Sequence, residues 1–89
     1  MSEIRDFGIV IFSGDEPVIE DLDDGKTARL TATPLPDGTV EIKSVIEERD
    51  ASGKRRVLGT PQAIAAPGQS VELAIGQIGL KLTPELRNK

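Results

Sequence analysis

Residues 25–27 (Gly-Lys-Thr) have the ending of the phosphate-binding loop found in many nucleotide-binding proteins. In that loop an earlier glycine, separated from the second by four residues, lets backbone amides surround the phosphate. Glu20 occupies the place of this earlier glycine, and the nearby Asp21 would repel a phosphate. The segment therefore does not predict nucleotide binding.

Acidic residues gather just before this segment, and clustered carboxylate oxygens are what a hard cation such as Ca²⁺ binds. When Gly25 is aligned with the invariant glycine of an EF-hand loop, ligand positions one, three and twelve fall on Glu20, Leu22 and Thr31, which is a poor ligand set. We interpret 15–24 as a mobile, charge-rich loop without a metal. The alternative is a small ligand- or cation-binding domain that uses this loop. Its acidic residues are Asp15, Glu16, Glu20, Asp21, Asp23 and Asp24.

The sequence has no histidine and no cysteine, so its serines lack the imidazole that usually activates a nucleophile. A serine activated by a lysine base remains open, although no spacing supports it. Residues 37–39 (Asp-Gly-Thr) have the residue types of an aspartic-protease triplet, but in the wrong order. We therefore predict a protein that is not an enzyme, with no catalytic residue, no cofactor and no metal site.

The chain of 89 residues can build one modest core, and we expect a single β-domain over 1–89. Its formal net charge of −4 argues against nucleic acid as a partner. The apolar run at 9–12 is much shorter than the ~20 residues that a membrane helix needs, and acids stand where a signal peptide carries positive charge. We expect no membrane insertion, and a protein that is either cytoplasmic or an excised domain of a cell envelope.

Apolar and polar residues alternate with a period of two in several short segments, which prolines and glycines separate. This pattern is typical of β-strands. The predicted fold class is all-β, a small antiparallel β-sandwich or meander of about seven or eight short strands. We expect the strands near residues 8–12, 17–20, 26–34, 39–49, 54–60, 62–66, 70–76 and 79–84.

Residues 36–38 (Pro-Asp-Gly) suit a three-residue hairpin loop, in which proline sets φ and glycine takes the left-handed conformation. This loop would place Ala32 opposite Ile42 and Ala28 opposite Ile46. The apolar faces of the two strands then coincide.

A second hairpin is predicted to turn at 50–53 (Asp-Ala-Ser-Gly). Opposite-charge pairs across two strands stabilise a sheet modestly. Counting outward from this turn gives the following partners: Glu48 and Arg55, Glu47 and Arg56, Ile46 and Val57.

The order of features over residues 30–78 includes Thr-Pro at 33–34, Pro-Asp-Gly-Thr-Val at 36–40, and Pro-Gly-Gln-Ser-Val at 67–71 before a strand that ends at Gly76. This order resembles the C-terminal β-region of bacterial secretins, the outer-membrane channels of secretion systems and type IV pili. The chain departs from that pattern, because 73–78 lacks the paired glycines and no aromatic girdle is present. The resemblance implies a soluble relative of secretins, an envelope-associated β-module that pairs with, scaffolds or regulates a larger assembly.

The segment from Phe7 to Phe12 contains a run that is apolar at every position, whereas the other predicted strands mostly alternate. Such a strand is either buried on both faces or paired at a sheet edge. An apolar edge can accept a further strand, from a second copy of the chain or from a protein partner. The candidate partner-binding residues are Phe7, Ile9, Val10, Ile11 and Phe12.

The main functional interpretation is therefore a non-enzymatic protein-interaction or structural β-module, in a bacterial envelope or secretion context. Its expected partner is a protein chain, bound through an edge strand.

Overall fold

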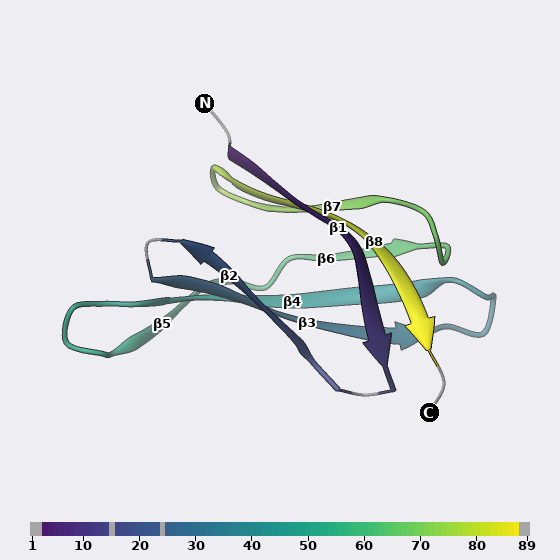
Figure 1. The fold of residues 1–89 in the computed structure, drawn as a ribbon, viewed down its shortest axis with the longest axis horizontal. Coiled ribbons are helices and arrows are strands. Elements are labelled where there is room, and N and C mark those ends of the chain that lie inside the picture. The colour runs from purple at the N-terminus through teal and green to yellow at the C-terminus, as the bar shows by residue number, and fades with distance from the viewer. Residues whose placement is uncertain (1–2, 15, 24, 88–89) are drawn as a thin grey trace.

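A computed structural model describes residues 3–14, 16–23 and 25–87, which form eight β-strands and no helix (Figure 1). The predicted all-β fold class is confirmed. Strand β3 has the predicted bounds, and the other strands lie at or near their predicted positions. The strands are β1 (Glu3–Ser13), β2 (Val18–Asp23), β3 (Lys26–Pro34), β4 (Val40–Arg49), β5 (Arg55–Gly59), β6 (Gln62–Ala65), β7 (Val71–Ile75) and β8 (Ile78–Arg87).

The strands form two sheets, which Figure 1 shows as two layers. One sheet has the order β1-β8-β7, and the other has the order β2-β3-β4-β5 with β6 also paired to β4. Strand β4 is long enough for β5 to pair with one half of it and β6 with the other. The described pairs are antiparallel except β1 with β8, the first and last strands of the chain, which run parallel.

Strands β1 and β8 are longer than predicted. Strand β1 begins at Glu3 instead of near 8, and β8 continues to Arg87 instead of ending near 84. The two pair along their lengths, from Glu3 opposite Ile78 to Ser13 opposite Arg87, so each extends the ladder of the other. Local periodicity carries no information about this pairing, because its partners lie at opposite ends of the chain.

The β3–β4 hairpin has the predicted loop and register. Ala32 lies opposite Ile42 and Ala28 opposite Ile46. The Leu35 N–H donates to the Thr39 carbonyl at 2.8 Å and closes the loop, while Gly38 takes a φ of 89°.

The predicted register of the β4–β5 hairpin is wrong by one residue. The Asp50 N–H donates to the Lys54 carbonyl at 3.0 Å, so the loop has three residues and the closing pair is Asp50 with Lys54. The Asp50 carboxylate favours this loop, because its Oδ1 accepts the backbone N–H groups of Ser52 at 2.9 Å and of Lys54 at 3.0 Å. The observed partners are Arg49 and Arg55, Glu48 and Arg56, Glu47 and Val57, and, beyond a bulge, Ile46 and Gly59.

The hydrophobic core lies between the two sheets and receives side chains from both. Burying a large aliphatic or aromatic side chain contributes about 1.5–3 kcal/mol, so the core is the main source of stability. Its buried members are Val10, Phe12, Leu73, Leu80 and Leu82 from the three-stranded sheet, and Leu22, Ala28, Leu30, Ala32, Val40, Ile42 and Ile46 from the five-stranded sheet.

Candidate interaction site at the β1 edge

Strand β1 is an edge strand of the three-stranded sheet. Within the described part of the chain it pairs with β8 alone, and the side of β1 away from β8 is called here the β1 edge. Alternate backbone N–H and C=O groups of an edge strand point outward, where they can pair with another strand. At 11 residues, β1 is the longest of the described strands and offers a long template for this pairing.

A β-bulge at Gly8 decides which side chains of β1 face the core. The register with β8 shifts between Asp6 and Ile9. Gly8 has a φ of 65°, a conformation that glycine adopts without strain, and its N–H donates to the Asp6 carboxylate at 2.8 Å. The extra residue changes the alternation, so that Phe7 on one side of the bulge and Val10 on the other both pack against the core.

The structure divides the five candidate residues between core and surface. Val10 and Phe12 are buried, with 4% and 0% of their surface exposed, and Phe7 is half-buried against the core. Ile9 and Ile11 point outward and remain 65% and 40% exposed. The apolar run therefore contributes to two faces of the sheet: Val10 and Phe12 belong to the core, and Ile9 and Ile11 belong to the exposed face.

Ile4 is 54% exposed on the same strand and was not among the predicted partner-binding residues. Because the strand was expected to begin near residue 8, Ile4 lay outside it. The alternation of Ile4, Arg5 and Asp6 is too short to signal a strand, and the pairing with β8 is what extends β1 to this position. The exposed apolar side chains of β1 are therefore Ile4, Ile9 and Ile11.

An open groove of about 450 Å³ borders Ile9. The turn at Pro67 and Gly68 forms one wall, and β8 from Thr83 to Leu86 forms the floor. The Gly68 N–H donates to the Pro84 carbonyl at 3.0 Å and holds the turn against β8. The groove therefore lies over β8, on the side of β1 opposite to the β1 edge, and touches β1 at Ile9.

Charges of both signs surround the exposed isoleucines. Lys81 lies opposite Asp6, and Glu85 lies opposite Ile11. The Arg87 Nε lies 3.7 Å from the Glu85 Oε1. This surface has no single-sign field that would select a strongly charged partner.

The acidic segment 15–24 is largely a strand, which corrects the prediction of a mobile loop. Residues 18–23 form β2 and pair with β3, from Val18 opposite Leu30 to Asp23 opposite Lys26. The described residues contain no group of three acidic side chains placed to hold a metal ion. Asp15 and Asp24 lie outside the described residues.

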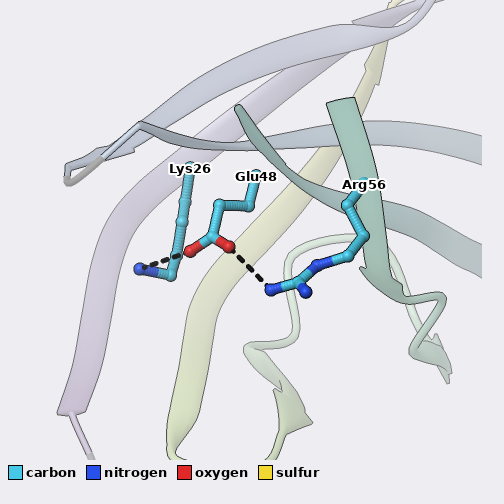
Figure 2. A network of polar contacts seen from close by, with 3 residues as sticks. All are labelled: Lys26, Glu48 and Arg56. Carbon is cyan, nitrogen blue, oxygen red and sulfur yellow. Dashed lines mark hydrogen bonds and ion pairs between the residues drawn. The ribbon is translucent and has the colours of Figure 1, made fainter. Parts of the chain in front are cut away.

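Lys26 of the Gly-Lys-Thr segment has a structural partner (Figure 2). Its Nζ lies 3.4 Å from one carboxylate oxygen of Glu48, and the Arg56 Nη2 lies 2.9 Å from the other. Gly25 turns the chain between β2 and β3 with a φ of 76°, and Thr27 belongs to β3. The geometry is that of a β-hairpin joined to its neighbour by an ion-pair network.

Three serines also have local structural partners. The buried Ser44 donates its hydroxyl to the Pro61 carbonyl at 3.0 Å. The Ser52 hydroxyl donates to Asp50 at 2.6 Å, and the Ser70 hydroxyl lies 2.9 Å from that of Thr83. These hydrogen bonds hold a strand, a turn and a strand end in place.

No protein-family model, curated protein or solved structure matches this chain.

Among the described residues, the structure contains no helix that could cross a membrane.

Proposed function

We propose that this chain is a non-enzymatic protein-interaction or structural β-module that accepts a further β-strand at the β1 edge. The observation that carries this proposal is a strand of 11 residues that, among the described residues, pairs on one side only and exposes Ile4, Ile9 and Ile11. The backbone of the edge supplies hydrogen bonds, and the isoleucines supply apolar contact area.

The bulge at Gly8 fits such a role. Natural edge strands limit uncontrolled pairing with bulges and charges, and β1 has both a bulge and the exposed Asp6 in its first half. The second half, from Ile9 to Phe12, pairs regularly with β8 and has no charge. We expect the added strand to pair with this half.

The resemblance of residues 30–78 to the β-region of secretins supports a setting in a bacterial envelope or secretion system. In this proposal the module pairs with, scaffolds or regulates a larger protein assembly. The added strand comes from a protein partner or from a second copy of the chain.

The test compares a double variant beside the β1 edge with a single control variant that makes the same kind of substitution elsewhere. Ile9→Lys/Ile11→Lys places charges beside the β1 edge, and Ile64→Lys places one on β6 of the other sheet, where Ile64 is 59% exposed. Each immobilised protein is used to capture partners from an envelope extract of the source organism, and self-association is followed by sedimentation.

We expect the wild type and Ile64→Lys to retain the same protein or to self-associate equally, and the β1 variant to lose this binding while it stays folded. Equal capture and equal sedimentation of all three proteins would disprove the role of the β1 edge.

A further inference from the structure

The five-stranded sheet ends in two edge strands of opposite charge. Strand β2 contains Glu20, Asp21 and Asp23 and no basic residue, whereas β5 begins with Arg55 and Arg56 and contains no acid. Neither strand pairs on its outer side within the described part of the chain. In the strand order β2-β3-β4-β5 they stand at opposite ends.

The direction of the strands permits β2 of one copy to pair with β5 of another. The three successive pairings from β2 to β5 are antiparallel, so β2 and β5 run in opposite directions. Moving one copy sideways along its own sheet therefore places its β2 antiparallel to the β5 of its neighbour. The right-handed twist of sheets adds a rotation to this movement.

One antiparallel register matches the outer face of both strands. Placing Arg55 opposite Asp21 pairs a base with an acid, and the same register puts Val57 opposite Ile19. Both apolar side chains are more than half exposed in the single chain, Val57 at 54% and Ile19 at 56%. Each would cover the other, as directly opposed residues do in antiparallel sheets.

The inner face matches in the same register. Arg56 falls opposite Glu20, and Leu58 falls opposite Val18. Leu58 and Val18 are both half-buried against their own cores. Arg56 already donates to Glu48 at 2.9 Å, but its side chain is 74% exposed and a guanidinium has further N–H donors for a second carboxylate.

Neighbouring registers lose this match. A shift of two residues in one direction puts Val57 opposite Asp21, and a shift in the other puts Arg55 opposite Ile19. A shift of one residue would place outward-facing side chains of one strand opposite inward-facing side chains of the other. Pairing β2 with β2, or β5 with β5, would bring like charges together.

We propose that copies of this chain associate head to tail, with β5 of one copy pairing antiparallel to β2 of the next, Arg55 opposite Asp21. The two surfaces differ, so the contact is heterologous and assembly continues beyond a dimer into an open, twisted array. This contact is separate from the β1 edge and does not depend on it.

The test exchanges the charges of one pair. Arg55→Glu and Asp21→Arg each produce a like-charge pair at the contact, whereas the double variant Arg55→Glu/Asp21→Arg restores an opposite-charge pair. An equimolar mixture of the two single variants also restores it, because each variant supplies the edge that the other needs. Lys43→Glu is the control for Arg55→Glu, since it makes the same charge change on the central strand β4.

Sedimentation velocity over a range of concentrations measures the association. We expect the wild type and Lys43→Glu to form species larger than a dimer at low salt, and added salt to weaken them. Each single variant should raise the dissociation constant about tenfold or more, which corresponds to a modest change in binding free energy. The double variant and the mixture should recover the wild-type behaviour.

A wild type that remains monomeric at high concentration would overturn the proposal. So would single variants that associate like the wild type, or a mixture that fails to recover. Thermal melting shows whether each variant is folded, and the mixture tests the contact even where a single change lowers stability. The association that Arg55→Glu and salt weaken should persist in Ile9→Lys/Ile11→Lys, whereas the binding that Ile9→Lys/Ile11→Lys removes should persist in Arg55→Glu. Failure at one surface is therefore distinguishable from failure at the other.

Discussion

Asp37 and Asp50 each stabilise one of the two long hairpins through hydrogen bonds to their carboxylates. The hydroxyl of Thr39 donates to Asp37 at 2.5 Å and its backbone N–H at 2.9 Å. Ser52 donates to Asp50 in the same two ways, and the Lys54 N–H donates as well. The hydroxyl hydrogen bond is the main cause that lowers the pKa of each carboxyl below its ordinary value, with backbone N–H groups contributing next.

This lowered pKa predicts an acid-dependent part of the stability. The folded protein holds the Asp50 carboxylate ionised at a pH where the unfolded chain binds a proton, so its contribution is present above the ordinary value of 3.8 and is lost as the pH falls through the lowered pKa. In Asp50→Asn the fall in melting temperature on acidification should be smaller than in the wild type.

Thermal melts from neutral to acidic pH check this expectation. Glu72→Gln is the control, because it removes an exposed carboxylate that makes no hydrogen bond in the described structure. If both variants changed the acid dependence equally, the loop hydrogen bonds would not be its source.

At the scale of elements, β1 shows how one strand serves two surfaces. The bulge at Gly8 lets Phe7, Val10 and Phe12 all pack against the core, although they do not follow one uninterrupted alternation. Ile9 and Ile11 then remain for the exposed face. One face of this strand therefore belongs to the core, and the other face is a candidate binding surface.

Adjacent lysine substitutions should separate these two faces. Val10→Lys buries a charge between the sheets and should lower the free energy of unfolding by about 3 kcal/mol or more. Ile11→Lys leaves the charge in water and should cost about 1 kcal/mol or less. Urea unfolding measures both values, and equal losses would contradict the assigned faces.

At the scale of the molecule, the first and last strands are neighbours in one sheet. Strands β1 and β8 pair in parallel, so the three-stranded sheet cannot form until the first and last strands meet. The β3–β4 hairpin needs only a five-residue turn region, from Leu35 to Thr39. Because distant pairings lose more chain entropy before they gain contacts, we expect the hairpin to form early in folding and the β1–β8 pair late.

Folding kinetics can test this order with two core substitutions. Ile42→Val shortens a fully buried side chain on β4, should cost about 0.5–1.5 kcal/mol, and should mainly slow folding. Val10→Ala on β1 should mainly speed unfolding. Stopped-flow chevron plots give both rates, and the opposite partition would place the β1–β8 pair in the folding nucleus.

The amino-acid sequence by itself determined the features that depend on neighbouring residues. Alternation predicted the strands, and the Pro-Asp-Gly loop predicted the register of β3 with β4, because a turn acts on residues that are already close. The β4–β5 register was missed by one residue, since the pattern at 50–53 did not show that Asp50 would close the loop with its carboxylate.

Only the tertiary structure decided the features that join distant segments. The parallel pairing of β1 with β8, the side of β1 that is buried and the division of β4 between β5 and β6 all depend on contacts across the chain. The same is true of the two charged edges, whose acids and bases stand far apart in sequence and become opposite borders of one sheet. Local periodicity cannot predict such contacts, because they arise when two apolar faces pack into one core.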